Sequence, residues 1–127
     1  MAALARCPSS GEPSFPKVNG VSFFQYLAAD PTRSQNMGGF MTGVYGPEGP
    51  KIAAGFPFGR FNSLIDIGGG QGHILAEILK AHRGLRGVLF ELSRTADMAR
   101  TFLVGAGLAD RTEVFQGELF LVCSIRI

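Results

Sequence analysis

An acidic residue followed by regularly spaced glycines marks the stretch of this chain whose residue types could bind a ligand. Asp66 is followed by glycine at every second position, at Gly68, Gly70 and Gly72. Glycine allows a backbone to turn tightly and leaves room for a ligand to approach it closely. A ligand without a pyrophosphate can bind beside a carboxylate that faces such a turn. These residues therefore form the first candidate binding site.

The residues around the glycines predict the elements that hold this candidate site. An apolar run, Leu64, Ile65 and Ile67, precedes the turn and is strand-like in residue type. After the turn, apolar residues recur at helical spacing, at positions 74, 75, 78 and 79. A strand, a glycine turn and a helix open a nucleotide-binding α/β fold. The free N–H groups and the positive dipole end of that helix would point at the ligand.

The spacing of the glycines argues against the dinucleotide-binding pattern G-x-G-x-x-G. Counted from Gly68, the third glycine would fall on His73, and counted from Gly70 it would fall on Leu75. The pattern present is D-x-G-x-G-x-G instead. A purely structural turn and another nucleotide fold remain alternatives, because a single glycine-rich loop is weak evidence by itself.

A second acidic residue strengthens the prediction of a nucleoside site. Residues 87–90 read as a second strand, which stops at Glu91, 25 residues after Asp66. An acid at the end of a second strand can accept hydrogen bonds from both hydroxyls of a ribose. The alternative is a glutamate in a solvated loop.

The composition is that of a globular protein and predicts neither a nucleic-acid nor a membrane partner. The 127 residues are enough for one domain, with 46% apolar and 17% charged residues. The net charge is only +2 and the basic residues are scattered. No apolar run approaches the roughly 20 residues of a membrane span. Cys7 and Cys123 lie near opposite ends without metal-ligand spacing, which favours a reducing compartment such as the cytoplasm.

The first part of the chain predicts a flexible N-terminal tail over residues 1–20, ahead of one domain over residues 21–127. Helices are expected over residues 21–29 and 32–45, the second with Asp30 as its N-cap and Pro31 as its first residue. Glycines at 38 and 39 weaken the second helix and would allow a close backbone approach. Its apolar stripe is expected to be core, with ligand lining as the alternative: Met37, Phe40, Met41 and Val44.

The last part of the chain completes an alternating pattern of strands and helices. Ser93 is expected to cap a helix over residues 95–104, which ends at Gly105 and Gly107, and a third strand is expected over residues 112–115. The order is thus two helices followed by β-α-β-α-β. Such alternation predicts an α/β fold with a parallel sheet and right-handed crossovers.

Three stretches, FFQYLAADPTRSQNMGGFMTGVYG, LIDIGGGQGHILAEILKAHRGLRGVLFEL and GLADRTEVFQGELF, together resemble one family. It is the S-adenosylmethionine-dependent small-molecule O-methyltransferases of plants, fungi and bacteria, and the match covers roughly residues 21–120. The resemblance implies a partial Rossmann-like methyltransferase fold, S-adenosylmethionine (SAM) as cofactor and a small acceptor with a phenol-type hydroxyl. By resemblance, the cofactor is held by Asp66, Gly68, Gly70, Gly72, Glu91, Leu92, Glu118 and Leu119.

The resemblance also gives individual roles within that set. Glu91 would bind the ribose and Leu92 would pack near the adenine. Family members usually carry Gly-Asp-Phe or Gly-Asp-Met after the third strand, and those two residues contact the adenine. This chain has Gly117, Glu118 and Leu119 there. Glutamate keeps the charge of the aspartate but places it one methylene farther from the backbone.

Members of the family also have two parts that have no counterpart in this sequence. One is a helical dimerisation domain ahead of the matched region. Another is a general-base histidine in a Leu-His-Asp-Trp-like stretch after a fourth strand, which would lie beyond the end of this chain. The chain's own histidines, His73 and His82, are expected to be structural. We therefore expect no catalytic residue, no nucleophile–base pair and no metal cluster in this chain.

Two classes of function remain at this stage. The first is the cofactor-binding, N-terminal part of an O-methyltransferase domain, truncated here, whose parent would be a homodimer. The second is a non-catalytic fragment that keeps only half of a SAM site. An NAD(P)-dependent oxidoreductase is a more distant alternative, because the third glycine of the dinucleotide pattern is missing.

Overall fold

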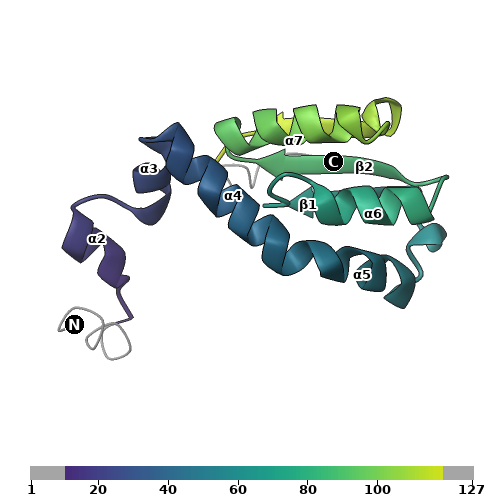
Figure 1. Cartoon of the computed structure of the whole chain (residues 1–127). Helices are drawn as coiled ribbons and strands as arrows, with labels where there is room; N and C mark the ends of the chain where they lie inside the picture. The colour runs from purple at the N-terminus through teal and green to yellow at the C-terminus, as the bar shows by residue number, and fades with distance from the viewer. Residues whose placement is uncertain (1–10, 119–127) are drawn as a thin grey trace. The chain divides into compact units, whose positions relative to one another are not determined.

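The computed structural model describes residues 11–118 of the chain. The chain divides into two units, residues 1–37 and 38–127. The division falls inside a long helix, α4 (Pro31–Tyr45) (Figure 1). Each unit is described by itself below.

The first unit contains two short helices, α2 (Ser14–Asn19) and α3 (Phe23–Ala28), and the start of α4. Helix α2 lies within residues 1–20, for which the sequence predicts a flexible tail. The ring of Phe15 in α2 packs edge-on against the rings of Phe23 and Tyr26, with both pairs of centroids 5.3 Å apart. These ring contacts join residues 8 and 11 positions apart, so the proline and serine content around Phe15 did not predict them.

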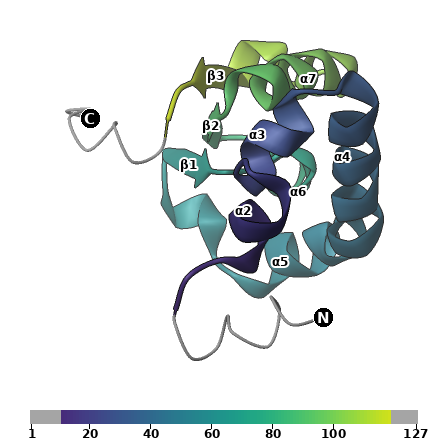
Figure 2. The same cartoon turned by 90° about the vertical axis from the view of Figure 1, so that its left-hand side faces the viewer.

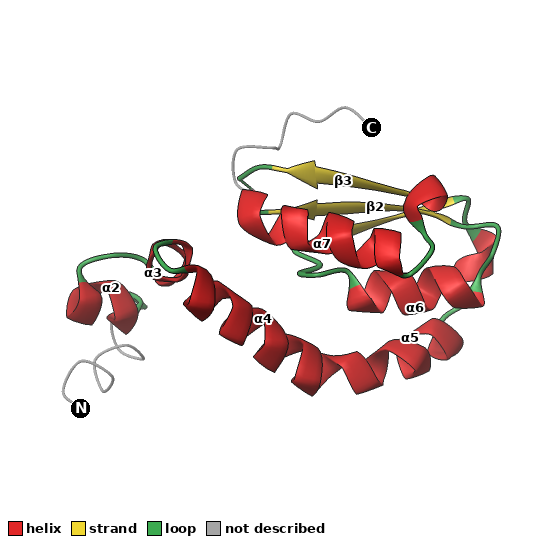
Figure 3. Cartoon of the chain, turned by 45° about the horizontal axis from the view of Figure 1, so that its top comes forward, coloured by secondary structure: helices red, strands yellow, loops and turns green. Residues whose placement is uncertain are grey.

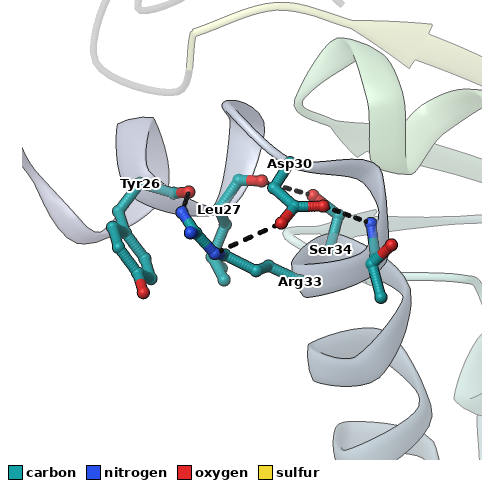
Figure 4. A network of polar contacts seen from close by, with 6 residues as sticks. Tyr26, Leu27, Asp30, Arg33 and Ser34 are labelled. Carbon is teal, nitrogen blue, oxygen red and sulfur yellow. Dashed lines mark hydrogen bonds and ion pairs between the residues drawn. The ribbon is translucent and has the colours of Figure 1, made fainter.

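The connection between α3 and α4 is fixed by short polar contacts (Figure 4). The Oδ1 atom of Asp30 accepts a hydrogen bond from the Thr32 N–H at 2.8 Å, which confirms Asp30 as N-cap and Pro31 as the first helical residue. The Ser34 hydroxyl donates to the Leu27 carbonyl at 2.8 Å. The Arg33 guanidinium lies 4.1 Å from the centre of the Tyr26 ring, and its Nε lies 3.4 Å from Asp30 Oδ2. The predicted helix start is therefore confirmed with its cap.

The second unit is a three-stranded parallel sheet with connecting helices. The strands lie in the order β1-β2-β3 and can be followed in that order in Figure 2. After the end of α4 the elements are η1 (Gly46–Glu48), α5 (Gly49–Gly55), η2 (Phe58–Arg60), β1 (Ser63–Ile67), α6 (His73–Ala81), β2 (Arg86–Glu91), α7 (Ser93–Gly105), η3 (Ala109–Arg111) and β3 (Thr112–Gln116). The predicted β-α-β-α-β order and parallel sheet are confirmed.

Helices α6 and α7 lie on the same side of the sheet (Figure 3). Two right-handed crossovers that step across a sheet in one direction must place both helices on one face. The core between this face and the helices is apolar, with Leu75, Leu79, Leu85, Leu89 and Leu103 as its largest fully buried side chains. On the opposite face, Ile65, Ile67 and Phe115 are 38%, 62% and 49% exposed. Within the described residues of this unit, these parts of that face are therefore open to solvent, whereas Phe90, between Ile67 and Phe115 in the register, is buried.

Arg111 ties the end of α6 to the segment that leads into β3. Its guanidinium donates to the carbonyls of Leu79 and Arg83, both at 3.0 Å, and of Leu85 at 3.2 Å, with the His82 carbonyl at 3.4 Å. The last carbonyls of a helix have no partner inside the helix. Arg111 therefore supplies donors that the sequence of α6 itself does not.

Two predictions about the helices need correction. Helix α7 starts at Ser93 with Leu92 as N-cap and no side-chain cap, so Ser93 is not the cap. The apolar stripe of α4 is not core, because no residue of α4 is buried and Phe40 is 62% exposed. None of the described helices is long and apolar enough to cross a membrane.

Candidate functional site

The predicted site residues lie at the edge of the sheet where the parallel strands end. The register pairs Ile67 at the end of β1 with Phe90 in β2, and Glu91 at the end of β2 with Gln116 in β3. The loop of residues 68–72 follows β1 and leads into α6. In open α/β sheets, ligands bind outside the carboxyl ends of the strands. The fold therefore places the glycine loop and Glu91 at the edge where a ligand site is expected.

The glycine loop is held by backbone hydrogen bonds and by left-handed backbone angles. The Gly68 N–H donates to the Phe90 carbonyl at 2.9 Å, and the Gly72 N–H donates to the Gly69 carbonyl at 3.0 Å. The φ angles of Gly68, Gly70 and Gly72 are +71°, +59° and +84°. Side-chain-bearing residues adopt these angles at a cost, so the spacing of three glycines follows from the turn itself.

The third glycine of the loop faces the core rather than open space. A Cβ atom on Gly72 would lie 3.1 Å from a methyl of Leu89 on β2 and 3.4 Å from a methyl of Leu103 on α7. Cβ atoms on Gly68 and Gly70 would meet nothing within 4 Å. Gly72 thus allows α6 to start close against β2, while Gly68 and Gly70 leave the outer side of the loop uncovered. The sequence pattern alone did not separate these two uses of glycine.

Asp66 lies beneath the loop and is partly buried. A Cβ atom on Gly69 would overlap the Asp66 carboxylate, 2.5 Å from its Cγ. Burial, followed by the nearby charge of Glu91, raises the pKa of Asp66 above its ordinary value of 3.8. Gly69 is a position that the D-x-G-x-G-x-G pattern leaves open, and its place against Asp66 was not predicted.

Glu91 is joined to the glycine loop by its side chain. Its Oε2 atom accepts a hydrogen bond from the Gly70 N–H at 3.1 Å, and its Oε1 atom accepts one from the Leu92 N–H at 2.8 Å. The Glu91 backbone carbonyl accepts from the Gly117 N–H at 3.1 Å. Glu91 is therefore not the solvated loop glutamate of the alternative reading, since it connects the ends of β1, β2 and β3.

The two histidines both make contacts within the fold. The His73 ring lies 3.9 Å from the Phe102 ring, centroid to centroid, and its Nε2 is 3.4 Å from Gln71 Oε1. Burial lowers the pKa of His73, and the charge of Lys80 acts in the same direction. His82 Nε2 lies 3.0 Å from the Ala53 carbonyl, so it carries the proton and donates. These contacts support the prediction that both histidines are structural.

Gln71 links the loop to the helix α4. A Cβ atom on Gly38 would lie 2.5 Å from Gln71 Nε2 and 3.7 Å from Met98 Cε. The predicted close approach at the α4 glycines is therefore confirmed at Gly38. It is wrong for Gly39, where a Cβ atom would meet nothing within 4 Å.

Of the remaining predicted site residues, the structure describes two, which follow the ends of β2 and β3. Leu92 is half-buried as the N-cap of α7, and Glu118 is exposed after the end of β3. Leu119, Cys7 and Cys123 lie outside the described residues. Residues 11–118 contain no group of three or more His, Cys, Asp or Glu side chains that could hold a metal ion.

Comparison with known proteins identifies relatives over nearly the whole chain. Residues 2–123 match the family model described as an O-methyltransferase domain. Mitomycin biosynthesis 6-O-methyltransferase from Streptomyces lavendulae is 40% identical over 117 residues, which are 92% of this chain and 34% of that protein. Aclacinomycin 10-hydroxylase RdmB from Streptomyces purpurascens is 32% identical over 87% of this chain and 30% of its own length.

A solved structure is similar to this chain over most of its length. The O-methyltransferase NcsB1 from neocarzinostatin biosynthesis, in complex with S-adenosyl-L-homocysteine (SAH) and 1,4-dihydroxy-2-naphthoic acid, matches with a TM-score of 0.86 at 30% identity. The match covers 94% of this chain and 36% of that one. The chain thus spans about a third of the length of the curated relatives it matches. The match to the family model over most of its residues shows that the chain belongs to the O-methyltransferase family.

Proposed function

We propose that this chain forms the SAM-binding part of an enzyme that methylates a hydroxyl group of a small, phenol-type aromatic molecule. The observation that carries the proposal is Asp66, a carboxylate that lies against the glycine loop. SAM carries a sulfonium and an ammonium group, which this carboxylate attracts, whereas NAD carries a pyrophosphate, which it repels. Glu91 suits the ribose of either cofactor and does not decide between them. The relatives' names and the bound SAH of NcsB1 support the same choice of cofactor.

In this proposal each residue of the predicted set has a role toward the cofactor. Gly68 and Gly70 let the methionine part lie against the loop, because their outer sides are open. Glu91 accepts the ribose hydroxyls, and Leu92 and Glu118, with Leu119, border the adenine. Gly72 acts indirectly by setting the position of α6 against β2. Asp66 contributes negative charge beneath the loop.

The chemistry requires positioning and a base. When bound, SAM supplies a methyl group on a positively charged sulfur. That methyl group would pass to the acceptor oxygen, and the hydroxyl proton would pass to a base. The imidazoles of His73 and His82 already contact Gln71, Phe102 and the Ala53 carbonyl. We therefore place the base outside residues 11–118, and we place the working enzyme in the cytoplasm as a homodimer.

Titration calorimetry of the purified 127-residue chain tests the choice of ligand. We expect binding of SAM and of SAH, weaker or no binding of NAD, and loss of binding in Gly70→Val, since valine fills the open side of the loop. Tighter binding of NAD, or unchanged SAM binding in Gly70→Val, would contradict the proposal. Gly105→Ala, at the end of α7, is the matched control.

A methyl-transfer assay separates the two classes of function. With labelled SAM and a panel of phenols and catechols, we expect the chain alone to give no transfer above the uncatalysed rate. Transfer that disappears in Asp66→Ala would show that the chain is catalytic by itself. That result would place a base, or a mechanism without one, within this sequence.

A further inference from the structure

The Glu91 side chain binds the glycine loop in this structure. We propose that Glu91 is a positioning residue, which orders the glycine loop before the cofactor arrives and can hold the loop and two ribose hydroxyls at the same time. The second half of this proposal rests on the proposed function, whereas the first half does not.

The hydrogen bonds of the loop carry the first half. Gly68 and Gly72 donate their N–H groups to backbone carbonyls, at 2.9 and 3.0 Å, so the backbone fixes both ends of the loop. Gly70, between them, donates to a side chain, Oε2 of Glu91 at 3.1 Å. This bond joins residues 21 positions apart in the sequence. The middle of the loop is therefore tied to β2 through one carboxylate.

The position of Glu91 makes this tie rigid. Its backbone is in register with Gln116 of β3, and its carbonyl accepts from Gly117. Its second oxygen accepts from the Leu92 N–H at 2.8 Å, which fixes the side chain at the N-cap of α7. A carboxylate already held at one oxygen by the Leu92 N–H loses less freedom when its other oxygen binds the loop.

The number of hydrogen bonds that the Glu91 carboxylate can accept supports the second half of the proposal, which is simultaneous binding of the loop and two ribose hydroxyls. An ionised carboxylate has roughly four lone-pair positions on its two oxygens. Gly70 takes one position on Oε2 and Leu92 takes one on Oε1. One position on each oxygen is left, and a vicinal diol such as a ribose offers two hydroxyl donors. The chemistry of Glu91 thus suits a diol without release of the loop.

Hydrogen exchange of the ligand-free chain, followed by NMR, tests the role in the loop. In Glu91→Ala we expect the Gly70 amide to exchange roughly tenfold faster or more, which is the effect of losing one hydrogen bond to a charged group. The Gly68 and Leu89 amides should keep their protection. Asp97→Asn is the control, since it removes an exposed carboxylate of α7 away from the loop and should leave Gly70 protected.

A second measurement on the unaltered chain covers the case in which Glu91→Ala does not fold. A scalar coupling across the hydrogen bond, between the Gly70 amide nitrogen and the Glu91 carboxylate carbon, is expected in the ligand-free protein. Absence of this coupling, or unchanged Gly70 exchange in a folded Glu91→Ala chain, would overturn the role in the loop.

Addition of SAH tests simultaneous binding. We expect Gly70 to keep its protection at saturation, and faster exchange of Gly70 in the bound state would overturn the claim that Glu91 holds both. If SAH causes no change in any loop resonance, the proposed function fails, while the result for the ligand-free loop stands. The two failures are therefore distinguishable.

Discussion

Replacement of Gly72 by alanine is the most direct test of how the glycine loop is built. Gly72 has φ +84°, and an alanine there costs about 1–2 kcal/mol in the left-handed region. The new methyl would also lie 3.1 Å from Leu89 and 3.4 Å from Leu103. Overpacking of a filled core typically costs about 1–3 kcal/mol. The two effects together predict a loss of about 2–5 kcal/mol in the free energy of unfolding, out of about 5–15 for a typical domain.

Two further variants separate the backbone effect from the packing effect. Gly70 has φ +59° but open space around its missing Cβ, so Gly70→Ala should lose only the backbone part, about 1–2 kcal/mol. Gly105 lies in α7 with ordinary helical angles and open space, so Gly105→Ala should gain up to about 1 kcal/mol.

Urea unfolding followed by far-ultraviolet circular dichroism measures all three variants against the unaltered chain, with equal slopes as the condition for comparison. Equal losses in Gly72→Ala and Gly70→Ala would refute the packing argument. A Gly72→Ala chain as stable as the unaltered one would refute both parts of the reasoning.

Two other predictions concern Asp66 and Arg111. The raised pKa of Asp66 means that its ionised form is disfavoured in the folded chain, so stability falls as the pH rises from 3.8 through the folded pKa and is constant above it. In urea titrations, Asp66→Asn should therefore be more stable than the unaltered chain, by an amount that grows over this pH range. Asp97→Asn, which replaces an exposed carboxylate, should show no gain in stability. A stability difference between Asp66→Asn and the unaltered chain that does not change with pH would contradict this prediction. Arg111→Ala removes donors from the carbonyls of Leu79, Arg83 and Leu85 and should lose about 2–4 kcal/mol in the same unfolding measurement. Arg86→Ala, which loses one 3.4 Å contact, is its control, and equal losses in the two variants would show that the contacts of Arg111 contribute nothing special.

Local sequence patterns predicted the strands, the glycine turn and the helix α6, because each depends on residues close together in the chain. The apolar runs around Ile65 and Val88 and the glycines at 68, 70 and 72 required no knowledge of partners. The acidic residue at the end of β2 was also found from its distance to Asp66. Its cofactor role remains a prediction.

Features that depend on distant partners were not predictable in this way. The bond from Gly70 to Glu91 spans 21 residues, and the contact of Arg111 with Leu79 spans 32. The cap of α7 was misplaced because the helix starts one residue earlier, with the Leu92 carbonyl accepting from the Ala96 N–H and no side chain as cap. The stripe on α4 was taken for core because periodicity reports an apolar face but not what covers it.

The contacts of Arg111 have a consequence for the order in which this chain can fold during its synthesis. Leu79, Arg83 and Leu85 leave the ribosome before Arg111 does, so their carbonyls lack this donor until η3 has been made. The β1-α6-β2 portion therefore exists first without its final connection at the end of α6. The end of α6 reaches its final set of hydrogen bonds only when the residues that precede β3 have been made. Nascent chains that end before Arg111 should therefore be more sensitive to proteases at residues 82–86 than chains that include Arg111.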